Sequence, residues 1–202
     1  MLYKSLLCAH FIATAMAVSA QDVVFGIKGG VNGARFSENL NVDAALRWGP
    51  QIGIFMNNRK GLQAELNFSS FGQRNNVVSG SGTKVGETTV RSSYITLPIL
   101  GEIGKKAFRI HVGPQVGFLL AAKETGTISG QTVNDNLSEE AKPIDIGLCA
   151  GFSLHPSENT SIGLRRYWGL TNVFGKPNFT LPGVEWPDIR NRAWHIYLAI
   201  AF

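Results

Sequence analysis

The stretch Trp194-His195-Ile196-Tyr197-Leu198-Ala199-Ile200-Ala201-Phe202 alternates strictly between two kinds of side chain, and the sequence ends with it. One parity is large and apolar, and the other is smaller or polar. A period of two is the pattern of a β-strand whose two faces meet different surroundings. A final Phe in an apolar row is typical of outer-membrane β-barrels, whose last strand faces lipid and closes the barrel. The rest of the sequence tests this interpretation.

Seven further segments alternate in the same way. Each sets a row of apolar side chains against a row of Gly, amide or charged residues, although Arg166 interrupts the apolar row of the last. The seven segments are Val23–Phe36, Arg47–Asn57, Gly61–Gly72, Val90–Gly104, Ala107–Ala122, Ile144–His155 and Thr160–Phe174.

The connections between these segments alternate between long and short. Three are short turns with hairpin chemistry, at 57–61, 104–107 and 155–159. Four are long and polar: Ser37–Leu46, Gln73–Thr89, Lys123–Pro143 and Gly175–Asn191. Short periplasmic turns and longer extracellular loops are the pattern of outer-membrane barrels. The sequence therefore predicts an all-β fold, an eight-stranded antiparallel up-and-down transmembrane β-barrel.

A soluble exported carrier of the lipocalin kind is the main alternative fold. Its apolar faces would point inward around a ligand, and charged side chains would cover the outside. Here that orientation would leave an exterior of mostly Gly and amide residues, with few Lys or Glu to keep it soluble. The pattern favours the membrane barrel.

The first twenty residues read as a secretory signal peptide. Lys4 supplies the positive start, an apolar run follows, and Val18-Ser19-Ala20 is a small-residue cleavage motif. We expect residues 1–20 to be the signal peptide and residues 21–202 to be one barrel domain. Cleavage would remove Cys8 and leave Cys149 alone, so no internal disulfide is expected.

The inward face of the predicted barrel carries a balanced set of charges. The expected polar network of the lumen comprises Lys28, Glu65, Glu102, Arg109, Asp145, Arg165 and His195. Buried charges persist only when they are paired and hydrogen-bonded, so a structural plug is the simplest interpretation. A turn at Lys105-Lys106 would oppose Glu102 to Arg109 and predicts an ion pair between them. The same turn places Pro98 nearly opposite Pro114, where we expect a shared bulge or distortion of the ladder.

No catalytic, cofactor-binding or metal-binding residues are predicted. A lipid A-modifying enzyme would need a Ser/His pair facing lipid at the outer leaflet, whereas His155 and Ser157 fall in a short periplasmic turn. Metal-ligand clusters and phosphate-binding loops are not seen. The net charge of +5 comes from dispersed basic residues, without a nucleic-acid-binding motif.

Partners are expected at the membrane and at the loops. Aromatic side chains near strand ends suit interfacial girdles: Trp48, Phe71, Phe108, Trp168 and Trp194. Basic side chains at the rims suit the head groups of outer-membrane lipid and lipopolysaccharide. The strand ending in Phe202 is expected to engage the barrel-assembly machinery. The loop with Ser79-Gly80-Ser81-Gly82 and the acidic loop with Asp135, Glu139 and Glu140 are candidate contacts for a protein partner.

Four stretches of these strands form a recognisable set: Phe25–Asn32, Ile95–Leu100, Gly113–Lys123 and Tyr167–Asn172. Together they resemble the PorT-like small outer-membrane β-barrel family of Bacteroidetes-type bacteria. The resemblance implies the barrel fold and the cell outer membrane of a Gram-negative envelope, and one branch of the family is implicated in protein secretion. The expected function is a small non-conducting barrel that acts as a structural or interaction protein. The alternatives are the lipid A-modifying enzyme and the lipocalin-like carrier.

Overall fold

The computed structural model describes residues 23–37, 43–58, 60–175 and 188–202. The predicted signal peptide lies outside these ranges, as do parts of the first and last long loops. The described chain forms nine strands: β1 (Val23–Phe36), β2 (Asp43–Asn58), β3 (Leu62–Val78), β4 (Lys84–Lys105), β5 (Phe108–Ile128), β6 (Gln131–Asn136), β7 (Ile144–Leu154), β8 (Thr160–Gly169) and β9 (Asn191–Ala201).

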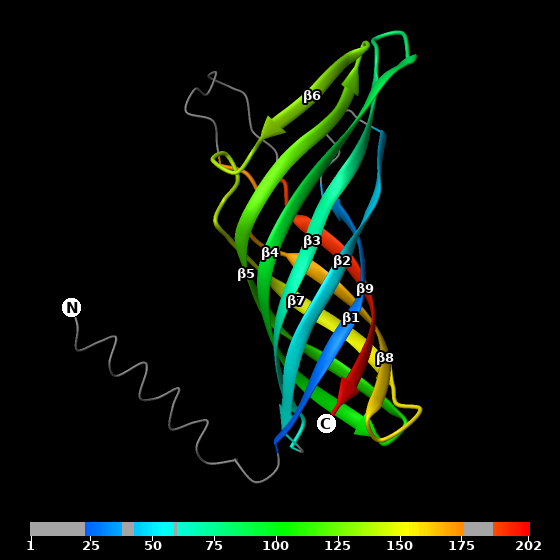
Figure 1. Cartoon of the computed structure of the whole chain (residues 1–202), viewed down its shortest axis with the longest axis vertical. Coiled ribbons are helices and arrows are strands. Elements are labelled where there is room, and N and C mark those ends of the chain that lie inside the picture. The colour runs from blue at the N-terminus through cyan, green and yellow to red at the C-terminus, as the bar shows by residue number, and fades with distance from the viewer. Residues whose placement is uncertain (1–22, 38–42, 59, 176–187) are drawn as a thin grey trace, which may run out of the picture.

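Eight of these strands close into a barrel (Figure 1). The antiparallel order is β4-β3-β2-β1-β9-β8-β7-β5, and pairing of β4 with β5 completes the ring. Closure satisfies the backbone without leaving a sheet edge in the membrane. β6 stands outside the ring and continues the chain from β5 as a hairpin. The eight-stranded antiparallel barrel is therefore confirmed, with β6 as an addition to it. Within the described ranges, no helix is both long enough and apolar enough to cross a membrane.

The apolar rows point outward and the polar rows point into the barrel. Phe118, Leu148 and Ile196 expose 43%, 47% and 45% of their surface, whereas Glu65 and Arg165 expose 3% and 1%. A lipocalin-like carrier requires the opposite orientation. The oily belt and the polar interior together fit a barrel whose solvent is lipid.

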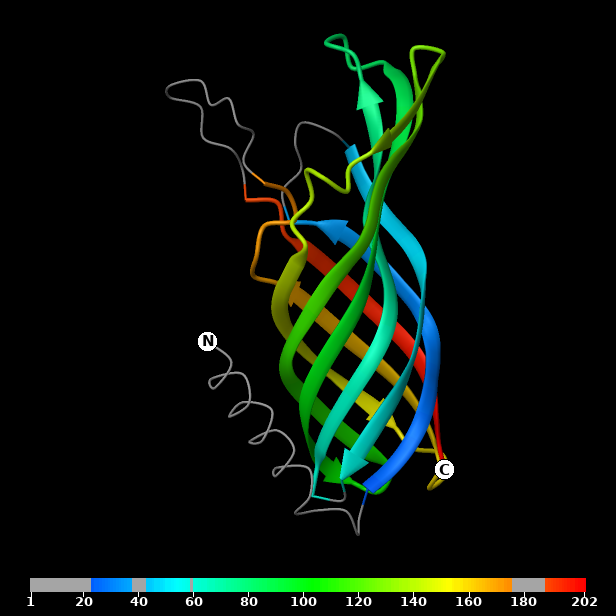
Figure 2. The ribbon, with the colours of Figure 1, turned by 60° about the vertical axis from the view of Figure 1, so that its left-hand side comes forward.

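Two predicted loops are largely strand, and residues 43–46 of the first long loop belong to β2. β3 and β4 continue beyond the barrel as a hairpin from Gln73↔Val90 up to Val78↔Lys84, and β5 and β6 form a second hairpin beside it (Figure 2). Ser129 and Gly130 both have positive φ, of 50° and 81°, as a two-residue type I′ turn requires. These extensions carry no apolar row, because they do not face lipid, and so the alternation that revealed the barrel strands did not reveal them.

The turn between β4 and β5 lies one residue later than predicted, at Lys106–Ala107, and Glu102 therefore pairs with His111. Near Pro98 and Pro114 the β4–β5 pairing skips Ile99 and Leu100 but resumes in the same register at Gly101↔Val112. The ladder is therefore interrupted at the prolines, which is the distortion form of the prediction, but no residue is added there and no bulge forms. The register of this strand pair shifts between Ser93 and Tyr94. Ser93 pairs with Ala121 and Tyr94 pairs with Leu119, so Leu120 is the extra residue of a bulge.

Candidate functional site

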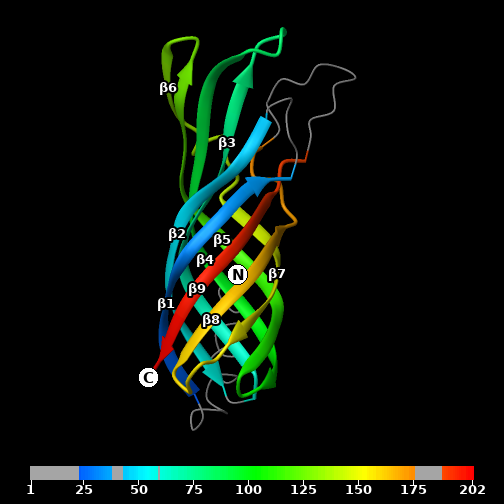
Figure 3. The same cartoon turned by 90° about the vertical axis from the view of Figure 1, so that its right-hand side faces the viewer.

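The inward residues of β1 mark successive layers of the lumen. Lys28 lies in a charged layer, Asn32 in an amide and imidazole layer, Ala34 in an aromatic layer and Phe36 in an apolar cap. β1 begins at the short-turn end of the barrel and rises to the end with the long hairpins (Figure 3). The layers therefore follow one another from the periplasmic end to the extracellular end.

Three of the predicted lumen residues form one buried ion cluster. Lys28 Nζ donates to both Glu65 carboxylate oxygens at 3.0 and 2.9 Å, and Arg165 donates two parallel hydrogen bonds to them at 2.9 and 2.8 Å. Gln63 and Asn67 donate two more, at 2.6 and 2.9 Å. The ionised side chains expose at most 2% of their surface. This saturation with hydrogen bonds is what allows charges to persist out of water.

Tyr197 completes this cluster from β9. Its ring centroid lies 3.8 Å from Lys28 Nζ and 5.3 Å from Arg165 Cζ. The cluster holds two cations and one carboxylate, so the π face of the ring is its second electron-rich neighbour. Tyr197 shares the inward parity of His195 on its strand. Its role could not be predicted, because a cation–π contact has no sequence signature.

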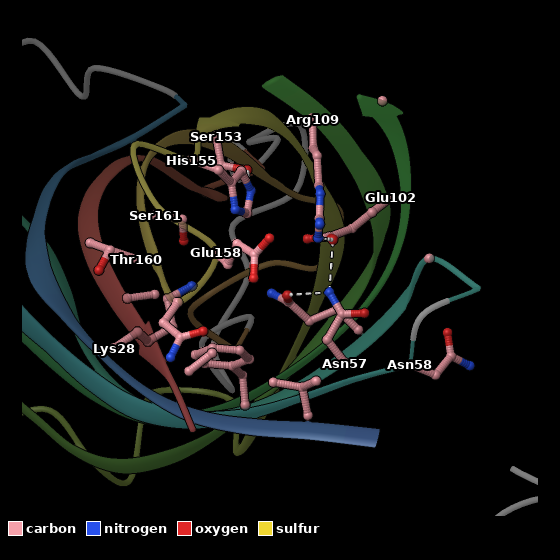
Figure 4. A pocket seen from close by; sticks show the side chains of 18 of the residues that line it. Lys28, Asn57, Asn58, Glu102, Arg109, Ser153, His155, Glu158, Thr160 and Ser161 are labelled. Carbon is pink, nitrogen blue, oxygen red and sulfur yellow. Dashed lines mark hydrogen bonds and ion pairs between the residues drawn. The ribbon is translucent and has the colours of Figure 1, made fainter. Parts of the chain in front are cut away.

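Glu102 and Arg109 form a second, separate cluster near the periplasmic opening. Arg109 Nη1 lies 3.3 Å from Glu102 Oε2, and Asn57 Nδ2 donates to the same oxygen at 2.8 Å (Figure 4). The predicted ion pair is present, but it crosses the ladder diagonally, since Arg109 pairs with Gly104 and not with Glu102. The pair survives the two-position difference in register because a long guanidinium side chain can reach a diagonal neighbour.

A cavity of about 880 Å³ opens at this end of the barrel, and we call it the periplasmic vestibule. Its lining reaches inward to Lys28 and Tyr197 and outward to the turns of the barrel. Figure 4 shows Lys28, Arg109, Glu102 and His155 arranged around this space. The vestibule is polar and wide enough to hold water.

His195 and Asp145 belong to neither ion cluster. His195 Nδ1 lies 2.6 Å from Asn32 Oδ1 and 3.0 Å from Gln51 Oε1, so this nitrogen carries the donated proton. Asp145 accepts hydrogen bonds from Thr171 Oγ1 at 2.9 Å and Asn191 Nδ2 at 2.8 Å. Among the described residues no cation pairs with Asp145, so the expected pairing of every lumen charge does not extend to it. Thr171 lies beyond the end of β8, and Asn191 is the first residue of β9. At such positions the alternation does not predict whether a side chain points into the lumen.

Above the charged layer the lumen is filled by aromatic side chains. Phe71 stacks on Tyr167 with centroids 5.7 Å apart and contacts Tyr94 at 5.6 Å, and all three are fully buried. Assignment of Phe71 to an interfacial girdle is therefore wrong: it shares the parity of the inward-facing Glu65 on β3. Trp48, Phe108, Trp168 and Trp194 do face outward. Cys149 is a buried free thiol in this layer.

An apolar cap closes the extracellular end. Phe36, Val90 and Val173 are buried there, with three partly buried neighbours packed on them: Leu137, Phe174 and Ile189. Backbone hydrogen bonds tie the segments together, from Lys142 N to Val173 O at 2.7 Å and from Val173 N to Ile189 O at 2.7 Å. The lumen is therefore packed toward the extracellular end and hollow at the periplasmic end.

A Ser/His contact does occur, but not the one considered from the sequence. Ser153 Oγ lies 3.1 Å from His155 Nε2, and both line the vestibule. Ser157 instead accepts a hydrogen bond from Thr160 N at 3.1 Å within the turn. Neither serine faces the outer leaflet, where a lipid A-modifying site would need its nucleophile. In the described part of the chain, no group of three His, Cys, Asp or Glu side chains is placed to hold a metal ion.

Comparison with known proteins supports the barrel. The computed fold superposes on Ail, the attachment invasion locus protein of Yersinia pestis, with a TM-score of 0.55 and 12% identity over 90% of this chain and 100% of that one. Ail in complex with the heparin analogue sucrose octasulfate gives 0.51, at the same identity and coverage. Neisserial surface protein A gives 0.49 at 14% identity, over 88% and 97% of the two chains. At this identity the likeness to Ail bears on the fold alone.

No curated protein matches the chain. Residues 19–175 match the family described as outer membrane protein beta-barrel domain, which is more than half of the sequence. Family and fold agree with the outward oily belt, and the protein is placed in the cell outer membrane. The chain belongs to the outer membrane protein beta-barrel domain family.

Proposed function

We propose that this protein is a non-conducting outer-membrane barrel that presents its extracellular sheet to a protein partner. The observation that carries the proposal is the contrast between the two ends. The packed aromatic layer and apolar cap support a lumen that does not conduct, while the hairpins above the membrane are long. Loops on a rigid barrel are where binding residues concentrate.

The extracellular sheet is built from the upper parts of β2, β3, β4, β5 and the whole of β6. β6 is its edge strand: it pairs with β5 along one side, and most of its residues are exposed. An edge strand offers unpaired backbone groups to another chain, which is the basis of recognition by strand addition. This edge supports binding of an extended segment of the partner.

Site-specific photocrosslinking in intact cells tests the proposal. A photoreactive residue in place of Thr132 on β6 is expected to give a discrete protein adduct. The same residue in place of Glu158, exposed in the β7–β8 turn at the opposite end, is the matched control. Adducts at both positions, or at Glu158 alone, would contradict an extracellular partner.

The resemblance to PorT-like barrels supports a finer proposal, in which the partner belongs to a protein-secretion system. A deletion strain should then lose secreted proteins from the medium while its other outer-membrane proteins remain at normal levels.

The same proposal includes export through the signal peptide 1–20, with cleavage after Ala20, and insertion by the barrel-assembly machinery through the strand ending in Phe202. It assigns the protein no enzymatic activity.

A further inference from the structure

Three arginine side chains interrupt the oily exterior at the extracellular end of the barrel. Arg35 lies near the upper end of β1, Arg166 near that of β8 and Arg192 near that of β9. These three strands lie side by side (Figure 3). Each residue shares the parity of the outward-facing apolar row on its strand. We call Arg35, Arg166 and Arg192 the arginine patch.

The contacts of the patch hold its guanidinium groups against the barrel surface. Arg166 Cζ lies 5.0 Å from the centroid of the Trp194 ring, and Arg192 Nη1 donates to Gly169 O at 2.6 Å. Arg35 pairs with Arg192 across the β1–β9 ladder, and both lie near enough to Arg166 for like charges to repel. Trp168 is the ladder partner of Arg192 on the other side. The patch thus combines positive charge with the aromatic residues of an interfacial girdle.

In the part of the chain that the structure describes, no acidic side chain forms an ion pair with the patch. Among the residues that the structure describes, none of the three arginines lies within 4.0 Å of a carboxylate oxygen. Outward-facing cations at membrane depth are unfavourable unless an anion meets them. An anion in the surroundings of the barrel can supply this negative charge. At this end of an outer-membrane protein, those surroundings are the outer leaflet.

We propose that the arginine patch binds the phosphoryl groups of lipid A. Arginine forms bidentate, charge-assisted hydrogen bonds with phosphate oxygens. Adjacent strands lie about 4.8 Å apart, so the patch spans roughly 10 Å, a footprint suited to a sugar head group. Below it the same strands present apolar side chains to the acyl chains: Ile27, Val31, Ile162, Leu164, Ile196 and Leu198. This inference depends on the orientation of the barrel in the outer membrane and not on the protein partner proposed above.

Binding of lipid A to the purified full-length chain in detergent micelles tests the proposal, with native mass spectrometry as the readout. Bisphosphorylated lipid A is expected to bind at least about tenfold more tightly than the same lipid without phosphates, the equivalent of one charge-assisted contact. Arg166→Gln should weaken binding by about the same factor. Lys105→Gln removes one charge at the periplasmic end and should change it by less than about twofold.

Four results would overturn the proposal. Equal binding of the dephosphorylated lipid would assign recognition to the acyl chains, and unchanged binding by Arg166→Gln would place the phosphates elsewhere. Equally tight binding of phosphatidylglycerol would reduce the patch to a general anionic surface. Displacement of lipid A by millimolar inorganic phosphate would make it a site for the free ion.

Faster migration of unboiled samples on a gel confirms folding of each variant. If Arg166→Gln fails that check, Arg35→Gln, which is more exposed, replaces it with an expected loss of about threefold.

Discussion

Glu65 is the acceptor on which the charged layer depends. Four side chains donate to its two oxygens: Lys28, Arg165, Gln63 and Asn67. Glu65→Gln keeps the size of the side chain but leaves two buried cations without a counter-charge. We expect a loss of about 3–5 kcal/mol in the free energy of unfolding, as for other buried pairs broken from one side. Urea titration of the barrel folded into lipid vesicles measures it.

Two further variants calibrate this result. Lys28→Met leaves the neutral, bidentate Arg165–Glu65 pair in place, so its unfolding midpoint should fall less than that of Glu65→Gln. Glu87→Gln removes a carboxylate from an exposed ion pair with Lys84 and should leave the midpoint unchanged. An equal effect of Lys28→Met and Glu65→Gln would contradict this order, because it would make Lys28 as important to this layer as the carboxylate.

His155 gives the protein a pH dependence at the periplasmic rim. Burial and the nearby Arg109 guanidinium lower the pKa of His155 from 6.5, and Glu102 only partly opposes them. A lowered pKa means that the folded state binds the proton less readily than the unfolded state does. Stability must therefore fall as pH drops through 6.5 toward the lowered value. The midpoint advantage of the native protein over His155→Gln should shrink between about pH 8 and about pH 5. A constant difference would contradict this.

At the scale of an element, β1 shows that two neighbouring residues of a strand face different environments. A Cβ on Gly30 would collide with the backbone carbonyl of Ile196 on β9, whereas a Cβ on its neighbour Gly29 would meet no atom within 4 Å. Gly30→Ala should therefore cost about 1–3 kcal/mol, as overpacked positions do. Gly29→Ala, on the lipid-facing side, should not destabilise the barrel. Vesicle unfolding of the two variants side by side measures the difference, and equal stabilities would mean that the facing of β1 is wrong.

The same alternation explains which elements the sequence could predict. Within the membrane each strand separates lipid from a polar lumen, and the residue pattern records that separation. β1 was predicted with its exact bounds for this reason. Above the membrane neither face of a strand meets lipid, so the upper part of β4 and all of β6 have no period-two row of apolar side chains. Their Thr and Val content favours strand only weakly in the absence of burial, so both segments were predicted as loops.

The β5–β6 hairpin is an addition to the barrel and not a part of its closure. β5 pairs with β7 through Phe108–Phe118, below the hairpin. Replacing 125–134 with Asn-Gly should therefore leave a barrel that folds and still shifts its gel mobility on heating, while the adduct expected at Thr132 is lost with its strand. Failure of this variant to fold would show that the extracellular sheet contributes to barrel formation.

At the scale of the whole molecule, the contents of the lumen were predictable and their connections were not. Parity identified Lys28, Glu65 and Arg165 as inward, but the 100-residue separation of Glu65 and Arg165 gives no hint that they meet. Whether two inward side chains meet depends on the register of the strand ladders. Register depends in turn on the position of each turn, and a displacement of one residue changes it, as the β4–β5 turn shows. The cap could not be foreseen, because it joins residues of β1 and β4 to residues of two connections that have no repeating pattern.

The layered lumen leads to a final prediction about permeability. The vestibule admits water from the periplasm, but ions moving outward would meet the Lys28–Glu65–Arg165 layer, then Phe71, Tyr94 and Tyr167, and then the cap. Planar bilayers containing the purified protein should therefore show no discrete conductance steps. Glu65→Gln should also remain silent, because the aromatic layer and cap stay in place. Conductance in the native protein would overturn the closed lumen. Conductance in Glu65→Gln alone would mean that the charged layer is the only seal.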